Sequence, residues 1–191
     1  MTSTALCGLG DWEKACFDRH NQLRALHGAT PLQWDASCRQ DAQQQANACA
    51  ARRTLFHGNH DNQGQNAHMS NPPADGARSV DDWYSEINDY DFNSGQSKNG
   101  RMVGHFTQLV WAETTHVGVA RSADGIWVIA NYRPPGNWCG EEAANVGPPN
   151  GTPSAASKVC LVLSFLLPLR VSNRNLQTQG QTQGKTAGAD K

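Results

Sequence analysis

Residues 104–111 read Gly-His-Phe-Thr-Gln-Leu-Val-Trp, and residues 128–138 read Val-Ile-Ala-Asn-Tyr-Arg-Pro-Pro-Gly-Asn-Trp. In the first stretch, His105 and Gln108 are one helical turn apart, so a helix presents both on one face, where they can line a cleft. In the second stretch, Asn131 comes at the end of a strand and also belongs to the cleft lining. The Pro-Pro-Gly-Asn run that follows excludes helix and regular strand, and therefore predicts a rigid turn.

The segments around these stretches alternate between helical and extended character. Apolar spacing of three and four predicts helices over residues 12–27 and 76–90, and a short helix over 105–111. Asp35 is typical of a helix N-cap and predicts an alanine-rich helix to about residue 53, whose small residues favour close packing on a sheet.

Strand character is concentrated in the second half of the chain. Residues 117–121 and 126–132 read as strands, and Ala-Asp-Gly between them predicts a hairpin. Residues 31–34 read as an extended link, residues 65–69 as a short strand and residues 91–100 as a loop. This order predicts an α+β fold, a three-layer α/β/α sandwich around a central antiparallel sheet.

The length and the shift in composition predict one domain with an appended tail. Residues 11–146 form the predicted domain, and residues 147–191 a linker and a disordered extension. The apolar run 159–169 is shorter than the roughly 20 residues that cross a bilayer, so no transmembrane segment is expected. Residues 1–10 lack the basic segment and apolar run of a signal peptide.

Charge and cysteine content restrict the partners and the chemistry. Sixteen basic and seventeen acidic residues give a net charge of −1, without the basic stripe that nucleic-acid binding requires. Six cysteines are compatible with a secreted disulfide set, but they allow 15 pairings and the sequence selects none. No Cys-x-x-Cys pair occurs, which disfavours a zinc ribbon or thioredoxin-type site.

The two quoted stretches resemble the two signatures of the CAP superfamily, which comprises the cysteine-rich secretory proteins, venom allergens and plant pathogenesis-related proteins. The resemblance extends over about residues 12–142 and includes the N-terminal pattern at residues 17–26. It implies the α/β/α sandwich, an extracellular location and disulfides. One departure is Ala130, because the second signature often has a cysteine just before its Asn-Tyr pair.

The resemblance also implies a cleft where two histidines and two glutamates meet. Carried over to this chain, the histidines are His57 and His105 and one acid is Glu86. The other acid belongs to a Gly-Glu-Asn step, which here reads Gly-Gln-Asn and puts Gln65 in its place. Two imidazoles can bind zinc through one nitrogen each, while their partners hold the other N–H. Because Gln65 carries no charge, we expect weak zinc binding by His57 and His105.

Three functions are compatible with this cleft. The first is a binding protein for a divalent metal and for a sterol or fatty acid, in defence or signalling, which the family resemblance implies for several members. The second is a protease-like hydrolase, which is disfavoured because no nucleophile motif is present and one acid is an amide. The third is a structural protein that recognises a protein partner and whose cleft is vestigial. No catalytic residue is assigned, and no cofactor is required.

Overall fold

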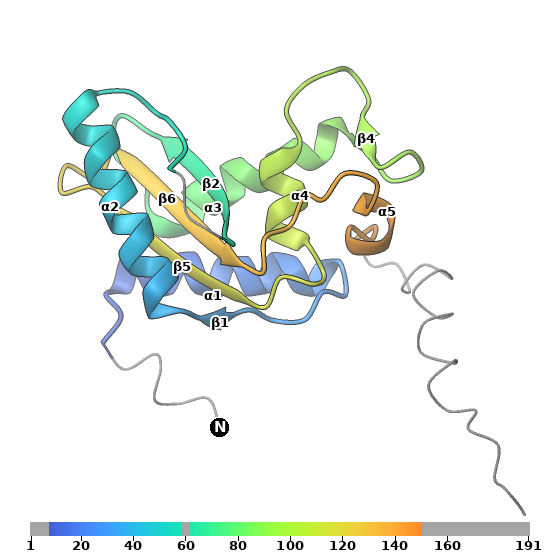
Figure 1. Cartoon of the computed structure of the whole chain (residues 1–191), viewed down its shortest axis with the longest axis horizontal. Coiled ribbons are helices and arrows are strands. Elements are labelled where there is room, and N and C mark those ends of the chain that lie inside the picture. Colours follow the sequence, from blue (N-terminus) through green and yellow to red (C-terminus); the bar gives the residue numbers. More distant parts are fainter. Residues whose placement is uncertain (1–7, 59–61, 150–191) are drawn as a thin grey trace, which may run out of the picture.

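The computed structural model describes residues 8–58 and 62–149, and Figure 1 shows the arrangement of their elements. The helices are α1 (Asp11–Leu26), α2 (Ala36–Arg52), α3 (Gly76–Tyr84), α4 (Gly104–Val110) and α5 (Glu142–Asn145), and a 3-10 helix, η1, spans Ser85–Asp89. The strands are β1 (Gln33–Trp34), β2 (Gly64–Met69), β3 (Tyr90–Asp91), β4 (Gln96–Ser97), β5 (His116–Arg121) and β6 (Trp127–Arg133).

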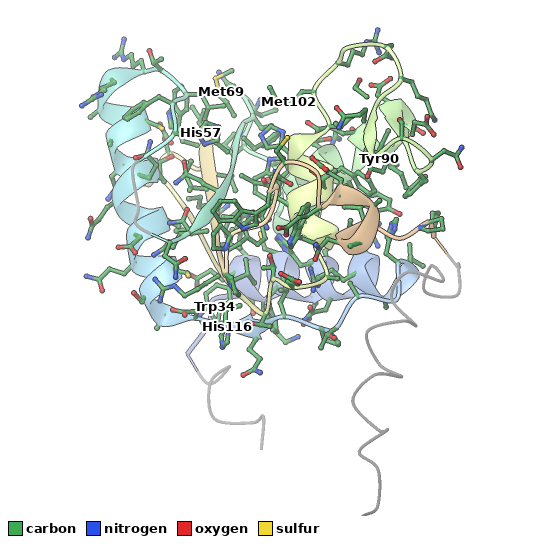
Figure 2. All side chains as sticks on the ribbon, turned by 45° about the vertical axis from the view of Figure 1, so that its right-hand side comes forward. Trp34, His57, Met69, Tyr90, Met102 and His116 are labelled. Atoms are coloured by element: carbon green, nitrogen blue, oxygen red, sulfur yellow. The ribbon has the colours of Figure 1, made fainter. Side chains whose placement is uncertain are left out.

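The central sheet has the strand order β1-β5-β6-β2. Strands β5 and β6 form the predicted hairpin, and β2 pairs with β6, both antiparallel. Strand β1 pairs with β5 in parallel, which the prediction of an antiparallel sheet did not contain. Figure 2 shows Trp34 of β1 and His116 of β5 together at one edge of the molecule. The α+β sandwich is confirmed, with a parallel strand added at one edge.

Helices cover both faces of the sheet and give three layers. In Figure 1, α2 lies on one side of β5 and β6, and α3 and α4 lie on the other. The α2 layer is thin because its buried positions are small, among them Ala42 and Ala46. A Cβ at Gly118 of β5 would stand 2.0 Å from the backbone nitrogen of Arg39, so a larger residue there would push α2 off the sheet.

The opposite layer carries the larger core. Its bulkiest fully buried side chains are aromatic, among them Trp83, Trp111, Tyr90, Tyr132 and Phe106. Because dense packing of such rings fixes the relative positions of α1, α3, α4 and the sheet, this core is the scaffold on which polar groups at its rim are held.

Arg24 of α1 is a completely buried cation that contacts backbone carbonyl groups of separate chain segments. Its guanidinium donates to the carbonyl oxygens of Thr30 at 2.9 Å, Leu109 at 3.0 Å, Trp111 at 2.8 Å and Thr114 at 2.9 Å. Burial lowers the pKa of Arg24 to about 10, so the side chain stays charged at neutral pH. It therefore satisfies several carbonyl groups around the end of α4 that would otherwise lack donors.

Two segments differ from the sequence-based prediction. The helix predicted over residues 76–90 ends at Tyr84 and continues as the 3-10 helix Ser85–Asp89. The segment predicted as a loop over residues 91–100 contributes to a short hairpin of β3 and β4. The predicted tail lies almost wholly outside the described residues.

The disulfides expected from the family resemblance are absent among the described cysteines. Cys16, Cys38, Cys49 and Cys139 are free thiols, and Cys7 and Cys160 lie outside the described residues. Two of the thiols, at positions 38 and 49 of α2, are separated by roughly 16 Å of helix, beyond the reach of a disulfide. Burial raises the pKa of Cys38 to about 11, which keeps it protonated.

In the described part of the chain, no helix combines the length and the apolar character that crossing a bilayer requires.

Candidate functional site

The first half of the predicted cleft is a pair formed by His57 and Gln65. His57 follows α2 in an exposed loop, and Gln65 is the second residue of β2. The Gln65 Oε1 accepts from the backbone N–H of Gly58 at 3.1 Å and lies 3.0 Å from the His57 Nδ1. Because a carboxamide oxygen only accepts, His57 carries its proton on Nδ1 and leaves the Nε2 lone pair free.

The amide nitrogen of Gln65 is held from the neighbouring strand. Its Nε2 donates to the Oδ1 of Asn131 at 2.9 Å, and the two residues are direct partners in the β2–β6 register. Asn131 is completely buried, and its Nδ2 has no acceptor among the described residues. The amide of Gln65 is thus fixed at both ends, and with it the orientation of the imidazole.

The second half of the predicted cleft is a pair formed by Glu86 of η1 and His105 of α4. The Glu86 Oε1 lies 2.7 Å from the His105 Nδ1. Its Oε2 accepts from the backbone N–H groups of His105 at 2.9 Å and Phe106 at 3.1 Å. Because the residue at the N-cap of α4 supplies no side-chain cap, Glu86 takes over that role from outside the helix. His105 therefore also has Nδ1 engaged and Nε2 free.

Strand β2 connects the two pairs. Gln65 and Asn66 are consecutive, so their side chains lie on opposite faces of the sheet. The Asn66 Nδ2 donates to the carbonyl oxygen of His105 at 3.0 Å and contacts the hydroxyl of Tyr132 at 3.2 Å. The structure thus places all four predicted residues around one strand, as two hydrogen-bonded pairs.

A closed metal cage is not part of this arrangement. Within residues 8–58 and 62–149, no three His, Cys, Asp or Glu side chains are grouped closely enough to hold a metal ion. The two free Nε2 atoms are chemically suited to zinc, which prefers four ligands in structural sites, so solvent would have to complete the shell. Such a donor set fits an exchangeable ion better than a structural one.

The two predicted lining residues, Gln108 and Asn131, are buried inside the fold, Gln108 at 2% exposure and Asn131 at 0%. The Gln108 Oε1 accepts from the backbone N–H of Gly136 at 2.9 Å, and its Nε2 donates to the hydroxyl of Thr114 at 3.2 Å. Gln108 therefore fixes the Pro-Pro-Gly-Asn turn, and Asn131 fixes Gln65.

A buried network behind His105 was not predicted. The His20 Nδ1 donates to the carbonyl oxygen of Cys16 at 2.7 Å, and its Nε2 accepts from the Tyr132 hydroxyl at 2.8 Å. That hydroxyl in turn accepts from Asn66. Burial lowers the pKa of His20 to about 4, which keeps the ring neutral. The sequence signal for this network was Asn66 in the Gly-Gln-Asn step. From the sequence, a role was predicted only for the preceding residue, Gln65.

Two further histidines, His27 and His68, also have local partners. His27 lies 2.6 Å from the carbonyl oxygen of Gly147 and 2.9 Å from the Tyr84 hydroxyl, and the His68 Nε2 lies 3.1 Å from Asp82. Burial lowers the pKa of both imidazoles. These contacts are structural ones between elements of the fold.

Comparison with known proteins agrees with this architecture. The model of the CAP family, described as the cysteine-rich secretory protein family, matches residues 17–132. The chain belongs to this family.

Named relatives include plant and animal proteins. Pathogenesis-related leaf protein 4 of Solanum lycopersicum is 38% identical over 125 residues, covering 64% of this chain and 77% of the relative. Golgi-associated plant pathogenesis-related protein 1 of Homo sapiens is 37% identical over 138 residues, covering 68% and 88%. The chain is thus a relative of pathogenesis-related proteins.

Solved structures share the fold at lower identity. Venom allergen-like protein 4 of Schistosoma mansoni has a TM-score of 0.58 at 21% identity and covers 74% of this chain and 98% of its own. NaASP2, in a crystal structure with Zn²⁺, has a TM-score of 0.56 at 22% identity and covers 78% and 93%. These similarities concern the fold.

Proposed function

We propose that this protein is an extracellular binding protein of the defence or signalling type, with a cleft that holds a divalent metal ion such as Zn²⁺ weakly. The observation that carries the proposal is that the imidazoles of His57 and His105 have the same hydrogen-bonding pattern. Each ring has Nδ1 engaged by a side-chain oxygen, and its Nε2 has no hydrogen-bond partner among the described residues. A bound Zn²⁺ would act as a cross-link between the loop after α2 and the start of α4, with solvent as its further ligands.

The weakness of the site follows from Gln65. A carboxylate that accepts from a metal-bound imidazole makes the ring a better donor to the metal, and such partners contribute about 10–100-fold to affinity in other metal sites. Glu86 supplies this support to His105, whereas Gln65 supplies only a neutral acceptor to His57. The metal would therefore be bound by two imidazoles, of which only that of His105 has a carboxylate partner that makes it a better donor.

The variant Gln65→Glu is expected to bind Zn²⁺ about 10–100-fold more tightly than the wild type. The fold can accept the new carboxylate, because the amide of Asn131 can turn and present its Nδ2, which is buried and lacks an acceptor among the described residues. Titration calorimetry of the wild type and the variant at one pH measures the difference.

The matched control is the double variant Gln65→Glu, Asn131→Asp, in which two carboxylates face each other and the gain should disappear. His57→Ala and His105→Ala should each abolish measurable binding in both backgrounds. Equal affinity of the wild type and Gln65→Glu would contradict the role of Gln65. Unchanged binding in both histidine variants would overturn the metal proposal itself.

The same end of the molecule is proposed to take up a sterol or fatty acid. Met69 at the end of β2 and Met102 before α4 are exposed by 52% and 66%. Figure 2 shows both side chains at the same end of the molecule as His57. Methionine is flexible and polarizable, so it adapts to apolar ligands of differing shape. These side chains support an apolar surface at this end of the molecule.

Charges on this surface are expected to weaken apolar ligands. Met69→Glu and Met102→Glu should each reduce the affinity for a fluorescent fatty acid about tenfold, because burial of a methionine contributes roughly 1.5–3 kcal/mol. Displacement titration measures the effect, with Leu26→Glu as the control, since Leu26 is exposed by 40% on α1. An equal loss in all three variants would place the ligand elsewhere or indicate a general charge effect.

The hydrolase alternative has less support. Both oxygens of Glu86 already accept hydrogen bonds from His105 and the first turn of α4, so this carboxylate serves as a helix cap and an imidazole partner. A general base needs a free oxygen directed at a substrate proton. Binding of a protein partner by the same surface is compatible with the proposal, and the Met69 and Met102 variants would affect it in the same direction.

A further inference from the structure

A second hollow lies at the other end of β2 from Met69, beside the turn that follows β6. Its volume is about 430 Å³, within the range of small-molecule sites. Six residues line it: Asn62, Gln63, Pro135, Gly136, Asn137 and Trp138. Gly64 and Met69 are the two ends of a six-residue strand, so Met69 lies roughly 17 Å along β2 from the end at which the hollow lies.

The hollow presents an exposed indole whose orientation is fixed. Trp138 is 56% exposed, and its Nε1 donates to the carbonyl oxygen of Pro135 at 3.1 Å. The turn beneath it is tied down by Asn137, whose Oδ1 accepts from the Thr107 hydroxyl at 2.7 Å and whose Nδ2 donates to the Gly104 carbonyl at 2.9 Å. A ring held in this way loses little entropy when a ligand stacks on it.

The lining beside the indole includes amides. Gln63 is anchored to α2, because its Nε2 donates to the carboxylate of Asp41 at 2.7 Å. Its Oε1 has no donor among the described residues, and a buried acceptor in that state is costly. Asn62 is exposed at the same rim. Among the described residues, those that line the hollow carry no charge.

From this combination we propose that the hollow binds neutral sugar residues of a glycan. A pyranose ring has an apolar face of C–H groups that can stack on an indole, and hydroxyls at its edge that both donate to and accept from an exposed carboxamide such as that of Asn62. The uncharged lining favours a neutral sugar over an acidic one. The indole N–H is already used by Pro135, so it is not available to a peptide carbonyl, which disfavours a proline-rich peptide as the occupant.

This inference is independent of the metal and lipid proposals. None of the six lining residues belongs to the His57–Gln65 or Glu86–His105 pairs. The two sites are connected through α4, because Gln108 anchors Gly136 and Asn137 bonds Thr107 and Gly104. A failure of zinc or fatty-acid binding therefore leaves the glycan proposal untouched, and the reverse also holds.

The test is calorimetric titration of the whole protein with three neutral probes: cellohexaose, laminarihexaose and the chitin hexasaccharide. At least one is expected to bind, and Trp138→Ala should weaken it at least about tenfold, as truncation of an aromatic anchor does. Trp138→Phe keeps an aromatic face and should stay within a few fold of the wild type. Gln63→Ala should weaken binding to a smaller extent, and Leu26→Ala, at an exposed position on α1, should leave it unchanged.

Three results would overturn the proposal. The first is that none of the three probes binds at concentrations of up to about 10 mM, where an affinity of a few kcal/mol would still be detected. The second is equal binding by Trp138→Ala and the wild type, with unfolding midpoints verified to be the same. The third is binding of a heparin hexasaccharide or a decaproline peptide without any binding of the neutral probes.

Discussion

The free energy of unfolding of the variant Arg24→Met is expected to be about 3–5 kcal/mol lower than that of the wild type. Methionine fills much of the volume of arginine but cannot donate, so the carbonyl groups of Thr30, Leu109 and Thr114 lose their donor. The carbonyl of Trp111 loses one of two donors and keeps the backbone N–H of Thr114 at 3.2 Å. Each buried acceptor without a partner costs about 1–3 kcal/mol, and part of this is recovered by relaxation or entering water. Because domains have only about 5–15 kcal/mol in total, the variant should be barely folded.

Urea denaturation at neutral pH measures this loss. The free energy of unfolding of Arg24→Lys should lie between those of Arg24→Met and the wild type, because a single ammonium cannot reproduce the planar set of donors that reaches four carbonyls. Arg101→Met is the matched control, since Arg101 is 75% exposed and should change stability by no more than about 0.5 kcal/mol. A similar loss in Arg24→Met and Arg101→Met would contradict the role assigned to the buried guanidinium.

Acidification from pH 7 to pH 4 is expected to remove about 3 kcal/mol of stability through His20. Burial lowers the pKa of this imidazole from 6.5 to about 4 in the folded protein, and each pKa unit corresponds to 1.36 kcal/mol. Between these two pH values the unfolded chain binds a proton that the folded protein does not. Stability therefore falls as the pH falls, with the loss beginning near 6.5 and complete near 4.

His27 and His68 add to this trend, because burial lowers the pKa of both imidazoles as well. Urea midpoints at a series of pH values measure the slope. His20→Gln removes the titrating group and should flatten the curve between pH 6.5 and 4, whatever its effect at pH 7. If the slope of His20→Gln equals that of the wild type, another group governs the acid lability.

Much of the fold could be predicted from local patterns. Asp35 predicted the start of α2, and its side chain accepts from the backbone N–H groups of Ser37 and Cys38. The Asp-Gly between β5 and β6 predicted their hairpin. In contrast, β1 is two residues long and is held through β5, so no pattern within Gln33–Trp34 indicates its parallel pairing. Short elements that owe their conformation to a distant partner carry little signal of their own.

The candidate site could likewise be predicted only in part. The resemblance predicted four cleft residues, and in the structure these residues form two hydrogen-bonded pairs. It did not indicate Asn66, whose contacts to His105 and Tyr132 join residues 39 and 66 positions apart. Arg24 was equally invisible, because a lone arginine on a helix is usually solvated and only the assembled core creates the carbonyl groups around it.

The position of Glu86 couples the start of α4 to whatever binds His105. The carboxylate of Glu86 accepts from the imidazole of His105 and from the backbone N–H groups of His105 and Phe106 in the first turn of the helix. Asn66 of the sheet donates to the carbonyl oxygen of His105. A ligand on Nε2 therefore adds its free energy to an assembly of three chain segments that are remote in sequence. By reciprocity, a change that destabilises any one of these segments lowers the affinity of the His105 imidazole for its ligand, even when the change is distant from the imidazole.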